Sequence, residues 1–250
     1  MNVPALLQVE NVSKLFGRVA AVDRLSCEVR SGELVGVIGP NGSGKTTLVN
    51  LISGFIKPTS GRILYNGRDI TRTAPHNIVG MGISRTFQMV RPFYQLPAYK
   101  NMIIPLYSPR VRQMAGGRYG DRNAVALDLL EEVGFERDAN VAYKPAGTLP
   151  QGYLKRLELA KAIALSPHLL ILDELFSGMS LAEVASVVPV IEKLRMAGKT
   201  IIMIEHRLKE LFRIADRIMV LNYGRKIADG SASEVMESDE VKKAYLGSEE

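Results

Sequence analysis

The sequence has a single cysteine in 250 residues, and its apolar residues never form a long uninterrupted run. One cysteine excludes a disulfide framework within the chain and suits a reducing compartment. Cys27 lies in a segment that alternates apolar and polar residues, which favours a buried strand thiol over a nucleophile. Because no window approaches the roughly 18 apolar residues that a membrane-spanning helix needs, none is expected.

Two further signals are missing from the sequence. Met1 to Glu10 lacks the basic stretch and apolar core of an export signal, so we expect a cytoplasmic protein that reaches a membrane only through a partner. The net charge is +6 and the pI is near 9.4, yet Lys and Arg are scattered and do not alternate with aromatic residues. That pattern favours solvated basic surfaces, and no nucleic-acid partner is expected.

The composition that remains is that of a globular protein, with 46% hydrophobic residues and a mean hydropathy of +0.05. Alternating segments at Leu6 to Val12 and Leu25 to Val29 predict antiparallel strands. The apolar run from Glu33 to Ile38 stops at Gly39, and apolar positions recur at helical spacing after Lys45. The predicted order is therefore strand, glycine-rich loop, helix.

Residues 39 to 46 read GPNGSGKT and fit the pattern G-x-x-x-x-G-K-S/T. Glycines in this pattern let backbone N–H groups converge on phosphates at a helix N-terminus. Lys45 supplies charge to the β- and γ-phosphates, and the Thr46 hydroxyl is a magnesium ligand, so the predicted cofactors are ATP and Mg²⁺. The residues assigned to the nucleotide here are Gly39, Pro40, Asn41, Gly42, Ser43, Gly44, Lys45, Thr46 and Thr47.

A second motif follows the apolar run Leu169 to Leu172, which ends in Asp173 and Glu174. A strand end beside a phosphate loop is where a magnesium-holding Asp belongs, and the next carboxylate can polarise the attacking water. Asp-Glu after a strand is also a common capping pattern, so this assignment depends on the phosphate loop. Thr200 to Ile204 predicts another buried strand, as a parallel α/β sheet requires.

The middle of the chain has a different character. Met89 to about Thr148 carries no strong strand pattern, and Asn123 to Val133 has a helical apolar stripe. This predicts a helical subdomain inserted into the α/β core. Pro189 lies inside the predicted helix Leu181 to Met196, where we expect a kink.

The last quarter of the chain predicts a strand pair followed by a closing helix. The strands are Ile218 to Asn222 and Lys226 to Ala228, and the turn between them is Tyr223-Gly224. Ser231 and Glu234 have the spacing of a capping box at a helix start.

The motifs stand in a recognisable order: residues 39–46, Thr86-Phe-Gln88, Leu149-Pro-Gln-Gly152, Asp173-Glu174 and Glu205-His206. From end to end this set resembles the nucleotide-binding subunit of ABC transporters. The resemblance implies an α/β P-loop NTPase core with a mixed sheet, an antiparallel β subdomain and an inserted helical subdomain. It implies one ABC ATPase domain over 1–250, with the core and β subdomain in 1–88 and 161–250 and the helical subdomain in 89–160.

The resemblance also implies roles for single residues. Phe16 would stack on adenine, Gln88 would sense magnesium and the water, and His206 would contact the γ-phosphate. Without the family, these three are an edge or core aromatic, a loop amide and a strand-end histidine. The implied catalytic residues are Glu174, His206, Gln88 and Lys45, and the implied metal ligands are Thr46, Gln88 and Asp173.

A narrower likeness, to the ATPases of branched-chain amino acid importers, rests on residues 82–88, Gly178-Met179, 204–206, 220–224 and Ala244-Tyr-Leu-Gly247. Urea and amide importers have similar tails, so the solute stays open at this level. The likeness implies transmembrane permease subunits, a second ATPase subunit and, indirectly, a solute-binding protein. It places the chain at the cytoplasmic face of the membrane. The loop expected to dock a helix of the membrane subunit contains Arg91, Pro92, Phe93 and Leu96.

The signature loop departs from the family pattern, which is LSGGQ. Pro150 replaces the serine, so a hydroxyl and a backbone N–H that would bind the opposite subunit's γ-phosphate are both missing. Leu175 and Arg207 replace the usual Pro and Asp, and Ser180 replaces an Asp that communicates across the dimer. The residues assigned to the signature acting in trans are Pro150, Gln151, Gly152 and Tyr153.

Residues that act on this chain's own nucleotide are intact, so the sequence favours a heterodimer. This chain would hydrolyse ATP with another subunit's signature, while Pro150 impairs the partner's site. A homodimer would have slow hydrolysis in both sites. Two alternatives are a regulatory module with weak hydrolysis and an ABC ATPase that acts on ribosomes or nucleic acid. The latter predicts a second cassette, a coiled-coil insertion or basic-aromatic surfaces, and none is seen.

Overall fold

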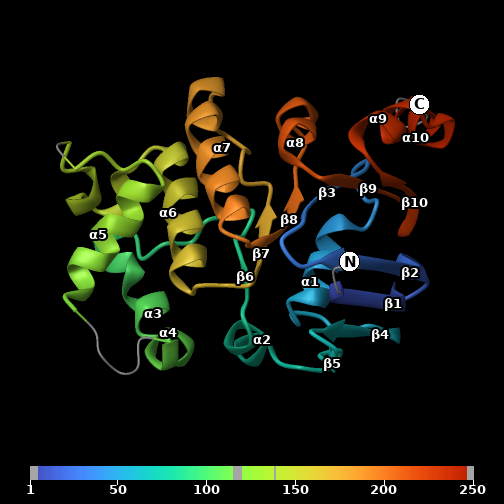
Figure 1. The fold of residues 1–250 in the computed structure, drawn as a ribbon, viewed down its shortest axis with the longest axis horizontal. Coiled ribbons are helices and arrows are strands. Elements are labelled where there is room, and N and C mark those ends of the chain that lie inside the picture. Colours follow the sequence, from blue (N-terminus) through green and yellow to red (C-terminus); the bar gives the residue numbers. More distant parts are fainter. Residues whose placement is uncertain (1–4, 115–119, 138, 247–250) are drawn as a thin grey trace.

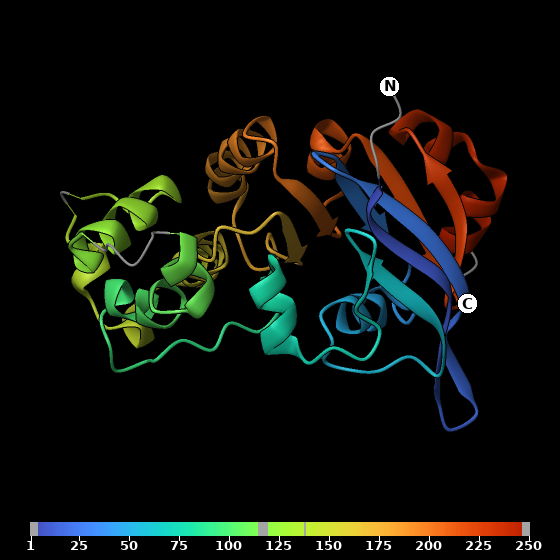
Figure 2. The ribbon, with the colours of Figure 1, turned by 60° about the horizontal axis from the view of Figure 1, so that its bottom comes forward.

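The computed structural model describes residues 5–114, 120–137 and 139–246, so Gly247 of the C-terminal motif lies outside the described residues. Two sheets occupy one side of the molecule, and most helices of the middle of the chain occupy the other (Figures 1 and 2). Within the described ranges, no helix has both the length and the apolar character needed to span a bilayer.

The first sheet is antiparallel, with strand order β2-β1-β4-β5. Alternate residues of its two long strands are buried, because successive side chains of a strand point to opposite faces. The predicted antiparallel strands are therefore confirmed, and they extend further than the sequence pattern indicated. The strands are β1 (Ala5–Phe16), β2 (Val19–Arg30), β4 (Ser60–Tyr65) and β5 (Arg68–Asp69).

The second sheet has the order β10-β9-β3-β8-β7-β6. Its neighbours are parallel except for β10, which pairs with β9 in antiparallel fashion, so the predicted mixed sheet is confirmed. Every residue of β3, β7 and β8 is buried, as expected for strands covered on both faces. The strands are β3 (Leu34–Ile38), β6 (Ile83–Arg85), β7 (Leu169–Asp173), β8 (Thr200–Ile204), β9 (Arg217–Asn222) and β10 (Arg225–Gly230).

The helices of the middle segment lie together, beyond β6 and β7 (Figure 1). This agrees with an inserted helical region. One long helix, α6, runs across residue 160, and the division of the chain at residues 89 and 160 stays a prediction. The helical elements here are η1 (Ala98–Met102), α3 (Ile103–Leu106), α4 (Pro109–Met114), α5 (Arg122–Glu132), η2 (Val141–Tyr143), η3 (Ala146–Thr148) and α6 (Gln151–Ala164).

The remaining helices connect strands of the two sheets or follow the last strand. Ser231 caps the helix that follows β10 through the predicted capping box with Glu234, which is confirmed. These helices are α1 (Lys45–Ile52), α2 (Pro75–Met81), α7 (Leu181–Met196), α8 (Leu208–Ile214), α9 (Ala232–Glu237) and α10 (Asp239–Leu246).

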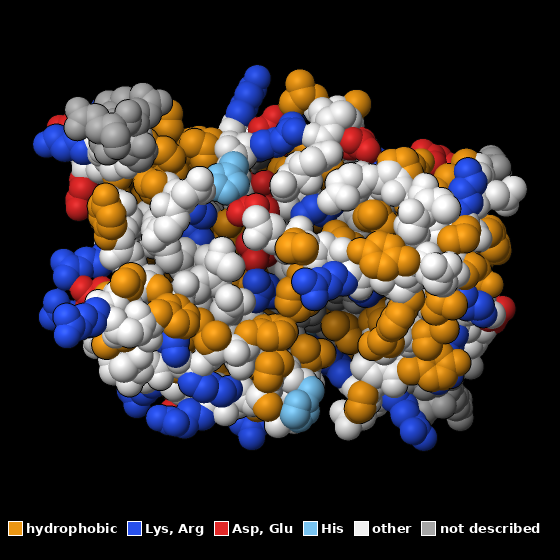
Figure 3. Space-filling view, turned by 180° about the vertical axis from the view of Figure 1, so that it is seen from behind, with side chains coloured by type: hydrophobic (Ala, Val, Ile, Leu, Met, Phe, Trp, Pro, Cys, Tyr) orange, Lys and Arg blue, Asp and Glu red, His pale blue; other side chains and the backbone are white. Residues whose placement is uncertain are grey.

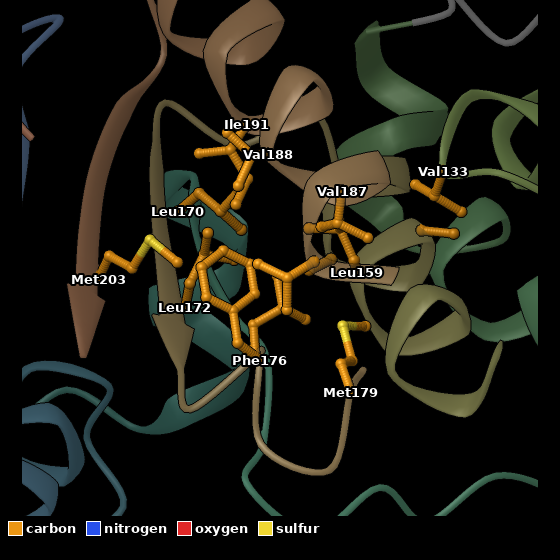
Figure 4. Close-up of a cluster of buried hydrophobic side chains, with 14 of the residues drawn as sticks. Val133, Leu159, Leu170, Leu172, Phe176, Met179, Val187, Val188, Ile191 and Met203 are labelled. Carbon is orange, nitrogen blue, oxygen red and sulfur yellow. The ribbon is translucent and has the colours of Figure 1, made fainter. Parts of the chain in front are cut away.

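A buried apolar cluster joins the mixed sheet to the helical region (Figure 4). Phe176 is fully buried in it, between Leu172 and Met203 on the strands and Leu159 and Val187 on the helices. Phe176 lies three positions after Asp173, the last residue of β7, so this packing anchors the end of that strand. A buried aromatic side chain of this kind contributes roughly 3 kcal/mol or more.

The predicted state of the single cysteine is confirmed. Cys27 lies in β2 with 7% of its surface exposed, and burial raises the pKa of its thiol to about 12. At neutral pH the side chain is therefore a protonated, buried thiol. It acts as a small apolar residue of the first sheet.

Helix α7 runs through Pro189, which is exposed. Proline has no N–H, so the carbonyl of Ala185 loses its donor within the helix. The bend at this position stays a prediction.

We expect Pro189→Ala to raise the free energy of unfolding by about 1 to 3 kcal/mol, because it restores that hydrogen bond and removes the ring from the helix. Urea denaturation measures the change. Met196→Ala is the control: Met196 is 88% exposed on the same helix, and its replacement should change the value by less than about 0.5 kcal/mol. No gain in the proline variant would contradict the expectation.

Candidate nucleotide-binding site

The glycine-rich loop connects β3 to α1, as the sequence predicted. Its glycines are required by close packing as well as by backbone geometry. Gly39 has φ of 151° and Gly44 has φ of 104°. A Cβ on Gly39 would lie 2.1 Å from the Leu221 carbonyl oxygen, and one on Gly44 would lie 2.5 Å from that of Ala21. The loop is therefore held between β9 and β2 in a shape that only glycine permits.

Lys45 lies inside this loop and not in solvent. Its Nζ donates to the carbonyl oxygens of Gly39 and Pro40, at 2.7 and 2.9 Å. Burial lowers the pKa of the ammonium group, and the nearby carboxylates of Asp173 and Glu174 oppose that shift. The lysine is thus at the start of α1, close to both acidic residues of the second motif.

The ends of three parallel strands meet at this edge of the mixed sheet. Val37 of β3 is in register with Ile204 of β8, and Ile204 is in register with Asp173 of β7. The residues that follow these positions therefore emerge side by side. This register brings the glycine-rich loop, the Asp-Glu pair and the Glu205-His206 pair to one place.

Glu174 is held from two sides by predicted site residues. The Gln88 amide Nε2 donates to Glu174 Oε2 at 2.6 Å, and His206 Nε2 lies 3.2 Å from Glu174 Oε1. Glu174 has a positive φ of 49°, and its N–H donates to the Ile204 carbonyl. Its side chain is 13% exposed, against 53% for His206. The structure brings these three residues together at the rim of the site.

Asp173 is almost completely buried beneath them. Its Oδ2 accepts a hydrogen bond from Arg85 Nη2 at 2.8 Å, while its Oδ1 is buried with no hydrogen-bond partner. Burial raises the pKa of this carboxyl, although the Arg85 guanidinium opposes the shift. An open cavity of about 480 Å³ adjoins it, lined in part by Thr46 and Gln88. The three predicted metal ligands therefore share one cavity.

A buried lysine supports the same region from the helical side. Lys155 of α6 is 1% exposed, and its Nζ donates to the backbone carbonyls of Gln88 and Glu174, each at 2.9 Å. Burial lowers the pKa of this ammonium group, and the Glu205 carboxylate opposes that shift. Lys155 thus links the helix that begins at the signature loop to the backbone of two predicted catalytic residues.

Phe16 is a predicted site residue that makes no hydrogen bond or ring contact with this arrangement within the described part of the chain. It ends β1, is 51% exposed and lies under the ammonium of Lys14, whose Nζ is 5.1 Å from the ring centroid. Among the described residues, no hydrogen bond or ring contact joins it to the glycine-rich loop. Its role toward adenine stays a prediction.

The signature residues start α6 and contact α7. Pro150 is the N-cap residue of α6, and no side chain caps this helix end. A Cβ on Gly152 would lie 1.8 Å from Glu183 Oε1, so a larger residue there would displace the Glu183 carboxylate. The Tyr153 hydroxyl donates to Glu136 at 2.7 Å.

The other residues that depart from the family pattern make contacts within the chain. Ser180 is the N-cap of α7 and forms a capping box with Glu183. The Arg207 guanidinium donates to the Met179 carbonyl, which ties the start of α8 to the loop before α7. Leu175 is 1% exposed and packs in the core.

Models of known protein families match this chain. A family model described as ABC transporter matches residues 22–177, which is more than half of the chain. This chain belongs to the ABC transporter family. A second model, described as branched-chain amino acid ATP-binding cassette transporter, matches residues 225–250 of the cassette.

The cassette resembles curated proteins over nearly its whole length. It is 35% identical to the high-affinity branched-chain amino acid transport ATP-binding protein BraF of Pseudomonas aeruginosa, over 97% of this chain and 98% of that one. It is 35% identical to LivG of Salmonella typhimurium, with the same coverage, and 32% identical to a probable LivG of Archaeoglobus fulgidus, over 98% and 96%.

Solved structures have the same fold. A nucleotide-free ATP-binding cassette from an ABC transporter superposes with a TM-score of 0.85 at 28% identity, over 97% of this chain and 99% of that one. An ATP-binding cassette in its ADP conformation gives 0.83 at 30% identity, over 98% and 99%. The cassette is therefore a transport-coupled ATPase by family, with the predicted α/β architecture.

Two residues of the site were not singled out by the sequence motifs. Arg85 stands within the quoted segment 82–88, but nothing local indicates its partner 88 positions away. Lys155 reads as an ordinary helix residue, and only its burial reveals its contacts with Gln88 and Glu174.

Glu205 gives the cassette a pH-dependent stability. It is 3% exposed and accepts a hydrogen bond from the Phe176 N–H at 2.8 Å, yet burial raises its pKa from 4.5 to about 7. The folded chain therefore binds this proton more tightly than the unfolded chain. The resulting stabilisation is fully present below about pH 4.5 and is lost as pH rises through about 7.

We expect Glu205→Gln, which keeps an oxygen acceptor, to reduce the fall in unfolding free energy between about pH 5 and pH 8. The reduction is at most about 3 kcal/mol, because one pKa unit corresponds to about 1.4 kcal/mol. Denaturant unfolding at both pH values measures it. Glu237→Gln, at an exposed position of α9, is the control; an equal fall in wild type and the Glu205 variant would contradict the prediction.

Proposed function

We propose that this cassette hydrolyses ATP to drive import of branched-chain or related amino acids through membrane permease subunits. Hydrolysis rests on one observation: Gln88, Glu174 and His206 are joined by hydrogen bonds at the strand edge that carries the phosphate loop. The solute class is supported by the family match over residues 225–250 and by the names of the relatives. Urea or amide import is the alternative for the solute.

The proposed roles follow from where each group lies. The loop N–H groups and Lys45 bind the β- and γ-phosphates, with Lys45 exchanging its carbonyl partners for phosphate oxygens. Glu174 aligns and polarises the attacking water, and its carboxylate is oriented by Gln88 and His206 from two sides. His206 also neutralises charge on the γ-phosphate. The half-exposed ring of Phe16 provides the surface for adenine.

The donor set fits Mg²⁺. Asp173 Oδ1 is buried without a partner, and Thr46 and Gln88 line the same cavity. Oxygen ligands are those that Mg²⁺ prefers. The described residues contain no group of three or more His, Cys, Asp or Glu side chains that could hold a metal, so phosphate oxygens and water would complete the shell. Held there by Thr46, Gln88 and Asp173, magnesium would neutralise charge on the nucleotide phosphates.

The proposed assembly is a head-to-tail heterodimer with a second ATPase. Pro150 offers neither a hydroxyl nor an N–H to a γ-phosphate held by the partner, and no side chain replaces them at this helix end. Glu183 lies against Gly152, so an acidic group also repels an anion there. The residues proposed to act on this chain's own nucleotide carry no such defect. The same signature defect supports a second candidate, a regulatory cassette with weak hydrolysis.

The surface after Gln88 suits the docking of a membrane subunit. Met89, Phe93, Tyr94 and Leu96 are 70%, 50%, 52% and 39% exposed. Seen from behind, hydrophobic side chains gather over the half of the molecule formed by the helical region (Figure 3). Exposed apolar patches of this kind mark interaction sites. Docking here would hold the cassette peripherally at the cytoplasmic face of the membrane.

We expect Glu174→Gln to lower ATP turnover of the assembled transporter by at least about 100-fold and to leave ATP binding intact, because the general base is lost and the phosphate loop is not. Phosphate release and binding of a fluorescent ATP analogue measure the two effects. Glu237→Gln is the matched control on the exposed face of α9.

The size of the loss tests whether this chain carries the active site. A heterodimer with one active site loses nearly all turnover. Turnover that stays near the wild-type value would contradict catalysis by this chain. A wild-type complex that binds ATP without hydrolysing it would favour the regulatory cassette.

A further inference from the structure

Arg85 occupies the space between β7 and α1. It ends β6, and its side chain is only 8% exposed. Its Nη2 donates to Asp173 Oδ2 at 2.8 Å. Its Nη1 donates to Asn50 Oδ1 at 2.6 Å and to Ser53 Oγ at 3.2 Å, at the far end of α1. One guanidinium therefore bridges the strand end that carries Asp173 to the helix that carries Thr46.

The guanidinium group is well suited to fix the geometry of this bridge. It is planar, always charged, and its donors have a rigid fork arrangement. The fork occupies one oxygen of Asp173 and leaves the other, Oδ1, buried and without a partner. Asp173 is held from behind as well, because its N–H donates to Thr86 Oγ1 at 3.1 Å.

Two aromatic rings cover the guanidinium. The Arg85 Cζ lies 5.0 Å from the ring centroid of Phe87 and 5.8 Å from that of Phe55. The two rings meet edge to face, with centroids 5.5 Å apart and planes at 87°. Rings at these distances attract a cation and keep water away from it. The bridge is therefore desolvated, and its hydrogen bonds are strong for that reason.

We propose that Arg85 is a positioning residue for magnesium. By holding Asp173 Oδ2 and anchoring itself on Asn50, it aims Oδ1 toward Thr46 and keeps the two ligands at a constant spacing. This inference rests on the proposed function, in which Thr46 and Asp173 hold the metal. Arg85 does not contact the nucleotide phosphates or the attacking water in this role, and it acts through Asp173.

The guanidinium has two opposing effects on a cation. It orients the ligand, but its positive charge repels Mg²⁺ through the shared carboxylate. We expect the orienting effect to dominate. A residue that hydrogen-bonds to a metal ligand typically contributes about 10- to 100-fold in metal affinity. If repulsion won, removing Arg85 would tighten magnesium binding. The direction of the shift therefore decides between the two effects.

The experiment measures metal-dependent nucleotide binding, not turnover. The full chain is titrated with Mg²⁺ in the presence of a fluorescent, non-hydrolysable ATP analogue, and the Mg²⁺ concentration at half-maximal response is recorded. Arg85→Ala should raise that concentration by about 10-fold or more. Arg85→Lys should raise it by less, because an ammonium group can still donate a hydrogen bond to Asp173 Oδ2, although it lacks the fork that also reaches Asn50. Binding of the analogue in EDTA should stay within about twofold of wild type, because the phosphate loop is unchanged.

Two variants guard against misfolding and nonspecific effects. Asn50→Ala removes the anchor on α1 while the pair with Asp173 remains, and it should give a smaller shift in the same direction. If circular dichroism shows that Arg85→Ala does not fold, the titration of Asn50→Ala tests the proposal in its place. Arg62→Ala is the control, since Arg62 pairs with Glu10 on the exposed surface of the first sheet, and it should leave the titration unchanged.

The Asp173→Asn variant tests the proposed magnesium site separately from the role of Arg85. If this variant titrates like wild type, Asp173 is not a metal ligand and the proposed magnesium site is wrong. If it shifts while the Arg85 and Asn50 variants do not, or shift to lower Mg²⁺, the metal site stands and only the role of Arg85 is overturned.

Discussion

The parallel hydrogen-bonded register of β3, β8 and β7 is the constraint on which the site depends. It aligns Val37 with Ile204 and Ile204 with Asp173, so the chain leaves all three strands at the same edge of the sheet. The glycine-rich loop, the Asp-Glu pair and His206 meet for this reason alone. A shift of one residue in β7 would place Glu174 where Asp173 now lies and bury the wrong carboxylate.

Buried cations then hold that edge in place. Lys45 is bound by carbonyls of its own loop, Lys155 by the backbone of Gln88 and Glu174, and Arg85 by the carboxylate of Asp173. Burying a charge is costly unless it is paired and hydrogen-bonded, and each of these groups has such partners. Desolvated cations thus fix the positions of the Asp173 and Glu174 carboxylates, while the apolar cluster around Phe176 contributes stability.

The substitutions in the signature region are accommodated by local structure. Ser180 and Glu183 cap α7, and the same Glu183 closes against Gly152. Arg207 binds the carbonyl of Met179. Through these contacts, the residues that differ from the family pattern take part in the folded structure of the chain. They do not replace the donors that Pro150 removes, so folding and the proposed action on a partner's nucleotide impose separate demands on this segment.

The sequence by itself determined the glycine-rich loop, the strand before it and the carboxylates after β7, because close backbone packing at Gly39 and Gly44 and the burial of whole strands leave local patterns. It also located Gln88 and His206 through a family likeness. Arg85 and Lys155 were decided only by the tertiary structure. Their partners lie 88 and 67 positions away, for Asp173 and Gln88 respectively. No periodicity or capping pattern encodes such contacts, because they exist only once the sheet register and the docking of α6 bring distant backbone and side chains together.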